Sequence, residues 1–142
     1  MSSVFTKIID GQIPGRFVWS DPECVAFLTV EPLRPGHTMV VPRAEIDHWL
    51  DVPDDLAQHL FTVARHIGRA QRNAFDPRRV GLLVEGYGVA HVHLHVWPSV
   101  SPEDFDPGNA ERDPDPAAMD AAAEQLRSRL RAHGHSEFVP QG

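Results

Sequence analysis

The feature that most constrains the fold of this chain is a segment in which histidines alternate with apolar residues, His91-Val92-His93-Leu94-His95-Val96-Trp97. Successive side chains of a β-strand point to opposite faces of the sheet, so the alternation predicts a strand over about 89–97. Its three histidines then share one face, about 7 Å apart along the strand, while the apolar residues enter the core from the other face. A chain with this segment must bury one face of a sheet and keep the other polar.

The rest of the chain predicts helices and strands in an order typical of an α+β protein. Helical spacing of apolar residues and runs bounded by Gly, Pro and Asp are the two signals used. They favour helices over 3–10, 53–75 and from 116 onward, and strands over 16–20, 24–30, 37–41 and 80–84. We therefore expect an α+β fold with a mainly antiparallel sheet, one long helix and a C-terminal helix.

The length of 142 residues is that of one domain. We expect residues 1–100 to form its main part, 101–116 to be a loop rich in proline and acidic residues, and 117–142 to be a C-terminal helix and tail packed on the same domain. A loop of that length is unusual inside a compact domain and is often functional. Because it follows the histidine strand directly, one hypothesis is that it closes over the site.

Composition and charge exclude several classes of function. With 13 Lys and Arg against 20 Asp and Glu, the formal charge is −7, which argues against a protein that coats nucleic acid or binds an anionic membrane. No apolar run approaches the roughly 20 residues of a membrane span, and the N-terminus lacks the pattern of a signal peptide. The single cysteine, Cys24, argues against an intramolecular disulfide and a cysteine-based zinc cage. It fits a reducing compartment, so we expect the cytoplasm.

Three interpretations of the histidine face are open from the residues alone. It could be a polar surface that happens to carry histidine, although such faces more often mix Lys, Glu and Thr. It could be a metal site, because paired histidines on a strand commonly ligate zinc, with any carboxylate ligand coming from elsewhere in the fold. It could carry nucleophilic catalysis on phosphorus, since neutral imidazole is a nucleophile near neutral pH and flanking imidazoles can orient it and bind phosphate oxygens.

The segment 91–97 resembles the His-φ-His-φ-His-φ-φ signature of the histidine triad (HIT) superfamily, in which φ is an apolar residue. Three further stretches, 5–14, 24–32 and 35–42, are similar to the N-terminal, second-strand and third-strand segments of that family. The resemblance covers about residues 4–98 and is of the Hint/Fhit-like bacterial type. It implies a HIT domain over 1–100 with the HIT-like α+β fold, and it supplies no motif for the loop and the C-terminal helix.

The resemblance implies a nucleotide hydrolase or nucleotidyl transferase that acts at an α-phosphorus without a metal or another cofactor. In the family the middle histidine attacks phosphorus and forms a nucleotidyl-histidine intermediate, which makes His93 the nucleophile. His91 and His95 would orient it and contact phosphate oxygens, and His37 would support the triad from behind. The implied partners are a small-molecule nucleotide and a second copy of the chain in a homodimer, with no nucleic acid and no membrane.

The same resemblance implies a substrate-binding set that consists of Phe5, Ile8, Ile13, Phe27, Thr29, Val30 and Gly88. Thr29 stands where nucleotide-binding members often place an aspartate for the ribose hydroxyls, and it offers one uncharged hydroxyl instead. Gly88 stands where many members carry a hydroxyl residue that contacts the scissile bridge. We therefore expect the nucleophile to persist while recognition of the sugar and of the leaving group differs.

Two other functions stay open at this point. The chain could be a noncatalytic nucleotide-binding protein that kept the scaffold, or a metal-dependent hydrolase in which His91, His93 and His95 are ligands. Sensitivity to a chelator separates the metal-dependent hydrolase from the covalent mechanism. Covalent labelling of His93 by a nucleotide separates the covalent mechanism from the noncatalytic protein.

Overall fold

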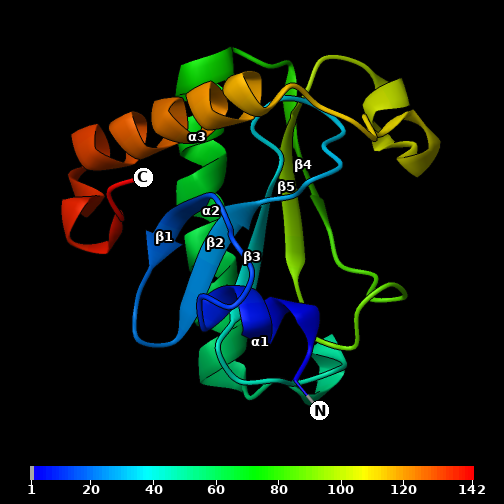
Figure 1. The fold of residues 1–142 in the computed structure, drawn as a ribbon, viewed down its shortest axis with the longest axis vertical. Helices are drawn as coiled ribbons and strands as arrows, with labels where there is room; N and C mark the ends of the chain where they lie inside the picture. Colours follow the sequence, from blue (N-terminus) through cyan, green and yellow to red (C-terminus); the bar gives the residue numbers. More distant parts are fainter. Residues whose placement is uncertain (1) are drawn as a thin grey trace.

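The computed structural model describes residues 2–142 and places most helices and strands close to where the sequence predicts them (Figure 1). Along the chain the regular elements are α1 Val4–Ile9, β1 Phe17–Ser20, β2 Cys24–Leu28, β3 Thr38–Pro42, α2 Asp54–Phe75, β4 Arg79–Leu83, β5 Leu94–Ser99 and α3 Pro116–Leu130. Short helical turns lie between and after them: η1 Trp49–Asp51, η2 Pro102–Phe105, η3 Pro107–Asn109, η4 Arg131–His135 and η5 Ser136–Phe138.

The strands form one antiparallel sheet in the order β1-β2-β3-β5-β4. β3 and β5 are neighbours although α2 and β4 separate them in the sequence, so the third predicted strand lies beside the histidine segment. His95 of β5 lies opposite Met39 of β3 on one side and Leu83 of β4 on the other. The predicted α+β fold with an antiparallel sheet is confirmed.

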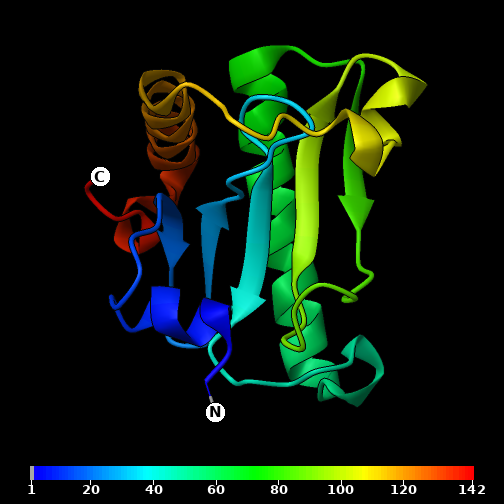
Figure 2. The same ribbon diagram turned by 45° about the vertical axis from the view of Figure 1, so that its right-hand side comes forward.

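One face of the sheet is covered by α2 and α3 and holds the main core (Figure 2). Strand residues such as Val40 and Val96 point to this side, where they meet the predicted apolar stripe of α2, including Val63 and Ile67. α3 packs on α2 and β1 and contributes the fully buried Leu126. Burying an apolar side chain of this size stabilises the fold by about 1.5–3 kcal/mol, so this face contributes a large share of the stability.

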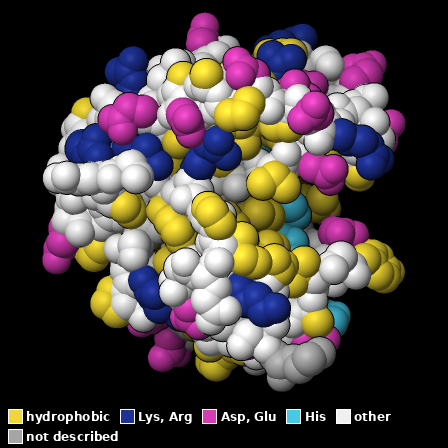
Figure 3. Space-filling model, in the orientation of Figure 1, with side chains coloured by type: hydrophobic (Ala, Val, Ile, Leu, Met, Phe, Trp, Pro, Cys, Tyr) yellow, Lys and Arg dark blue, Asp and Glu magenta, His cyan; other side chains and the backbone are white. Residues whose placement is uncertain are grey.

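The opposite face is covered only in part, by the short helix α1. The hydroxyl of Ser3 accepts the N–H of Thr6 at 3.0 Å and caps this helix. Phe5 of α1 then packs with Phe27 and Met39 in a second, smaller apolar cluster. Figure 3 shows histidine side chains in a hollow of this face, bordered by hydrophobic side chains.

The histidine strand is shorter than predicted, because the sequence predicts a strand over 89–97 whereas β5 is Leu94–Ser99. The residues before Leu94 have no strand to pair with. β4 ends opposite His95, and β3 pairs only with the first three residues of β5. Before β5 the backbone bonds elsewhere, since the N–H of Val92 donates to the oxygen of Ile46 at 2.7 Å. The prediction of three histidines within one regular strand is therefore wrong, although the apolar residues of the segment still point into the main core.

The predicted loop over 101–116 contains the helical turns η2 and η3 and lies near the end of β5 (Figure 1). Phe105 packs on Trp97 with ring centroids 4.9 Å apart. Gly81 makes room for this contact, because a Cβ there would lie 2.6 Å from Trp97 and 2.9 Å from Phe105. The N–H of Glu111 donates to the oxygen of Pro32 at 2.9 Å, which joins the segment to the connection before β3.

The C-terminal helix begins as predicted. The carboxylate of Asp115 accepts the N–H of Ala117 at 3.2 Å, and Pro116 takes the first helical position. The residues after α3 fold back onto β1, where Phe138 stacks on Trp19 with ring centroids 5.1 Å apart. None of the helices within residues 2–142 combines the length and the apolar composition that crossing a membrane requires.

Candidate active site

Four histidines meet on the partly covered face, where β3 and β5 pair. His37 precedes β3, His91 and His93 lie in the irregular segment before β5, and His95 belongs to β5. The ring centroids of His93 and His95 are 4.8 Å apart, and those of His37 and His95 are 5.1 Å apart. The structure thus brings together the four residues that the sequence suggested for this site.

His93 has one nitrogen bonded to the protein and one available for chemistry. Its Nδ1 lies 2.8 Å from the backbone oxygen of His91. A carbonyl oxygen only accepts hydrogen bonds, so Nδ1 carries the proton and Nε2 of the neutral ring keeps its lone pair. Among residues 2–142, Nε2 of His93 takes part in no hydrogen bond. An oriented, unprotonated imidazole nitrogen is a competent nucleophile.

His95 presents a nitrogen of the opposite kind. The backbone N–H of Leu33 donates to Nδ1 of His37 at 3.0 Å, so neutral His37 carries its proton on Nε2. This Nε2 lies 2.9 Å from Nδ1 of His95 and donates to it. His95 therefore carries its own proton on Nε2. A backbone amide thus determines, through two imidazoles, that a hydrogen-bond donor stands beside His93.

His91 is bonded to the protein through both nitrogens and has no exposed surface. Its Nε2 donates to the backbone oxygen of Pro42 at 2.8 Å, and its Nδ1 accepts from the hydroxyl of Ser3 at 2.7 Å. The resemblance implies that His91 contacts phosphate oxygens, yet neither nitrogen is free to do so. Its side chain instead fixes the segment whose carbonyl holds His93, and it joins that segment to the start of α1.

Burial keeps the imidazoles of His37, His93 and His95 neutral. Desolvation, together with the smaller effect of a neighbouring histidine, lowers the pKa of His37 to about 3 and that of His95 to about 4 from the usual 6.5. Burial also lowers the pKa of His93, against the smaller raising effects of its bond to the His91 carbonyl and of the Glu85 charge. At neutral pH the imidazole of His93 is therefore unprotonated on Nε2, and His95 is a neutral hydrogen-bond donor.

Aromatic side chains adjoin His93 on the side of α1. The ring centroid of Phe5 lies 4.8 Å from that of His93 and 5.7 Å from that of Phe27. Ile8 packs against the same cluster. Three of the predicted substrate-binding residues are therefore brought together next to His93. An apolar, aromatic wall of this kind suits a flat organic group.

The other predicted substrate-binding residues are not members of this cluster. The hydroxyl of Thr29, just after β2, accepts the N–H of Glu31 at 3.3 Å and keeps its own proton to donate. Val30 beside it is 71% exposed. Ile13 is half-buried in the turn after α1. Gly88 lies in the exposed link between β4 and β5, with open space where a Cβ would stand, so packing does not demand a glycine there.

Three groups that fix the histidines were not predicted from the sequence. Ser3 carries a signal that could have found it, because a serine directly before an amphipathic helix is a common N-cap. The N–H of Leu33 and the oxygen of Pro42 carry none, since every residue has backbone groups and only the fold shows which of them meet a side chain. The tautomers of the site therefore follow from the fold alone.

An antiparallel α+β domain that orients alternating histidines from one segment through backbone contacts defines a histidine triad protein. The matching family model is that of the HIT domain and covers residues 10–101. The chain belongs to the HIT family.

Known relatives agree with this assignment. The chain is 35% identical over 100 residues to the protein named hit of Bacillus subtilis. The aligned stretch covers 67% of this chain and 69% of that protein. A zinc-bound histidine triad family protein from Mycobacterium smegmatis matches 96% of this chain and 98% of its own, at 25% identity and a TM-score of 0.82. A hypothetical histidine triad nucleotide-binding protein from Sulfolobus tokodaii, 22% identical, shares the fold at a TM-score of 0.81, over 91% of this chain and 92% of that one. Family membership supports a role in binding or hydrolysing nucleotides.

Proposed function

We propose that the protein is a metal-independent hydrolase or nucleotidyl transferase that acts on the α-phosphorus of a nucleotide. The observation that carries this proposal is the pairing of an unprotonated Nε2 on His93 with a protonated Nε2 on His95, each determined by a backbone group. His93 is the nucleophile, and His95 is the donor to the reacting group. His37 and His91 position them without touching the substrate.

The reaction proceeds in two displacements at phosphorus. The lone pair of His93 Nε2 forms a nitrogen–phosphorus bond while the bond from phosphorus to the leaving group breaks. The leaving group departs with that electron pair and takes a proton from solvent, and the N–H of His95 donates a hydrogen bond to the developing negative charge. Water then attacks phosphorus, the nitrogen–phosphorus bond breaks, and the surplus proton of the water passes to solvent. Another acceptor in place of water makes the reaction a transfer.

The substrate-binding surface is proposed to extend from the nucleophile along α1 and the end of β2. Phe5, Ile8 and Phe27 form the apolar wall for a nucleobase, with Ile13 and Val30 at its margins. Thr29 offers the sugar one hydroxyl donor in place of a carboxylate. On the side of the leaving group, Gly88 offers only its backbone N–H and leaves space.

A fluorogenic adenosine phosphoramidate tests the proposal. We expect the native chain to turn it over in the presence of EDTA and His93→Ala to show no turnover above background. Quenching during turnover and measuring intact mass should reveal a nucleotidyl adduct on the native chain and none on the variant. Activity that disappears with EDTA while the chain stays folded, or an equal rate in the variant, contradicts the covalent mechanism. If the native chain forms no adduct with any nucleotide yet is stabilised by one, the noncatalytic alternative stands.

Two observations favour this function over its alternatives. Both nitrogens of His91 are bonded to protein groups, so the three triad histidines do not form a set of free metal ligands. A protein that only binds nucleotides has no need of a lone pair directed by a backbone carbonyl, as on His93.

We also propose that the chain works as a cytoplasmic homodimer. β4 lies at the edge of the sheet and exposes Leu82 and Leu83, and a groove of about 320 Å³ between α2 and β4 includes Phe61. An exposed edge strand with apolar side chains is a surface prone to pairing. Sedimentation should give a dimer for the native chain and a monomer for Leu82→Lys; a native monomer contradicts this assembly.

The single cysteine, Cys24, without a disulfide partner, fits a reducing compartment.

A further inference from the structure

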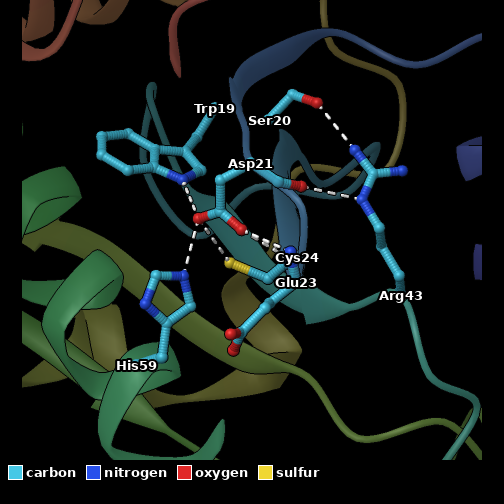
Figure 4. A network of polar contacts seen from close by, with 7 residues as sticks. All are labelled: Trp19, Ser20, Asp21, Glu23, Cys24, Arg43 and His59. Atoms are coloured by element: carbon cyan, nitrogen blue, oxygen red, sulfur yellow. Dashed lines mark hydrogen bonds and ion pairs between the residues drawn. The ribbon is translucent and has the colours of Figure 1, made fainter. Parts of the chain in front are cut away.

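A cluster of metal-ligating side chains lies where the β1–β2 hairpin meets α2 (Figure 4). Asp21 is in the hairpin turn, Cys24 begins β2, and His59 lies in the second turn of α2. Cys24 belongs to the main core, on the sheet face opposite the histidine triad. The reaction proposed for the triad uses none of these residues.

The ligand atoms of the cluster converge. A ring nitrogen of His59, Sγ of Cys24 and a carboxylate oxygen of Asp21 all lie within 4.8 Å of one another. Zinc bonds of about 2.0–2.3 Å at tetrahedral angles separate ligand atoms by about 3.3–3.7 Å. Sγ of Cys24 is 3.5 Å from Oδ2 of Asp21, which already fits, whereas Nε2 of His59 is 2.7 Å from that oxygen. The imidazole must therefore retreat by about 0.6 Å to reach zinc spacing, which its half-exposed side chain allows.

Asp21 is oriented by N–H donors of the surrounding chain. Its Oδ1 accepts the N–H groups of Glu23 and Cys24 at 2.7 and 2.8 Å, and its Oδ2 accepts the indole N–H of Trp19 at 2.7 Å (Figure 4). Contacts of this kind orient a ligating carboxylate. Arg43 lies nearby but donates to the backbone oxygen of Asp21 and not to its carboxylate.

The charge and chemistry of the cluster suit a divalent ion. Within residues 2–142, no Lys or Arg forms an ion pair with the buried carboxylate of Asp21. A divalent cation joined by one carboxylate and one thiolate is electrically neutral, which lowers the cost of burying these groups. Imidazole, thiolate and carboxylate are ligands that zinc accepts together. One cysteine cannot build a multi-cysteine cage, but a mixed set needs only one.

We propose that Asp21, Cys24 and His59 bind a zinc ion, with a water as fourth ligand on the side where His59 meets solvent. Binding replaces the thiol proton of Cys24, which passes to water. The imidazole proton of His59 moves from Nε2 to Nδ1, so that a lone pair faces the ion. The ion ties the β1–β2 hairpin to α2 and stabilises the fold, and it takes no part in chemistry at the triad.

Cobalt(II) is the probe for this site, because the chain has one cysteine and any thiolate-to-cobalt charge-transfer band reports Cys24 alone. The full chain is freed of metal with EDTA, dialysed and titrated with cobalt. We expect a near-ultraviolet charge-transfer band with the visible bands of four-coordinate cobalt, saturating at one ion per chain and lost when zinc is added. Absence of the charge-transfer band in excess cobalt overturns the proposal.

Three variants make the assignment specific. His59→Gln removes a half-exposed ligand and should weaken cobalt binding by more than the roughly 10- to 100-fold that loss of an outer-shell contact causes. Cys24→Ser should abolish the band and the rise in Tm that zinc gives the native chain. His133→Gln, which changes an exposed histidine of η4, should leave the titration unchanged. An unaltered titration in His59→Gln overturns the proposal even if Cys24→Ser fails to fold.

Discussion

The two faces of the sheet differ in how completely helices cover them. On one face α2 and α3 seal an apolar core in which residues such as Ile67 and Leu126 have no exposed surface. On the other face, the six-residue helix α1 covers only part of the strands, and histidines lie in the hollow beside it. We call the first the sealed face and the second the open face. Because side chains alternate along a strand, one segment supplies both faces. Changes on the two faces should therefore affect different measurements.

The largest effect should come from the donor on the open face. In the proposed reaction, His95→Ala removes the N–H that donates to the developing charge, and loss of one such donor lowers kcat by about 10²–10³-fold. The free energy of unfolding should change far less, because His95 is only partly buried and belongs to the smaller cluster's side of the sheet. Steady-state kinetics and urea unfolding of the same preparation check both halves. A kcat within a few-fold of native would remove His95 from the reaction.

On the sealed face, a substitution should lower the free energy of unfolding strongly and change kcat little. Leu126→Ala leaves a cavity between α3 and α2 and should lower the free energy of unfolding by about 2–5 kcal/mol. The kcat of the folded fraction should stay close to native, since the open face is untouched. Leu50→Ala is the matched control, because Leu50 is 69% exposed and surface truncations usually change stability by less than about 0.5 kcal/mol. Equal losses in the two variants would contradict the assignment of the core.

Acid should weaken the open face through its neutral histidines. The pKa of His37 is lowered to about 3 and that of His95 to about 4 in the folded chain, against 6.5 ordinarily. As the pH falls below 6.5, the unfolded chain takes up protons before the folded one, so stability is complete above about pH 6.5 and declines toward pH 4. Each such histidine contributes a slope of about 1.4 kcal/mol per pH unit in that window.

Urea unfolding at several pH values measures this slope. His37→Gln removes one of the two strongly shifted groups. The dependence of its unfolding free energy on pH should therefore be weaker than that of the native chain by the contribution of one histidine, about 1.4 kcal/mol per pH unit. His48→Gln changes an exposed histidine and should leave the slope unchanged. A native slope that survives in His37→Gln would show that burial of His37 is not the cause.

The sequence predicted best those features that local residue patterns determine, namely the bounds of the helices and the side chains that enter the core. Helical spacing located α2 within a residue at its start, and the proline after Asp115 located the start of α3. Alternation over 91–97 correctly predicted which side chains enter the core. It overextended the strand, because strand length depends on where the partners β3 and β4 end, and that information lies elsewhere in the chain.

The histidines of the site and a role for each were predicted from their spacing and from the family resemblance, but their tautomers and hydrogen-bond partners were not. His91 and His93 look alike in the sequence, yet one has both nitrogens bonded to the protein and the other has a free Nε2. The difference comes from the carbonyl of Pro42 and the hydroxyl of Ser3, which approach only in the folded chain. The cluster around Cys24 escaped notice for the same reason, since a lone cysteine predicts no site until the hairpin meets α2.

The smallest predicted effect tests how α1 is attached to the open face. Ser3→Ala removes the N-cap of α1 and the donor to Nδ1 of His91, and a lost cap of this kind costs about 0.5–2 kcal/mol of stability. The loss of stability should be smaller than that of Leu126→Ala, because α1 is a six-residue helix on the partly covered face whereas Leu126 lies in the main core. Ser3→Thr keeps the hydroxyl and should restore most of the stability, and Ser2→Ala, at the exposed neighbour, should have none of the effect. If Ser3→Ala is as stable as the native chain, the contact to His91 does not hold α1 in place, and the open face depends on the apolar packing of Phe5 instead.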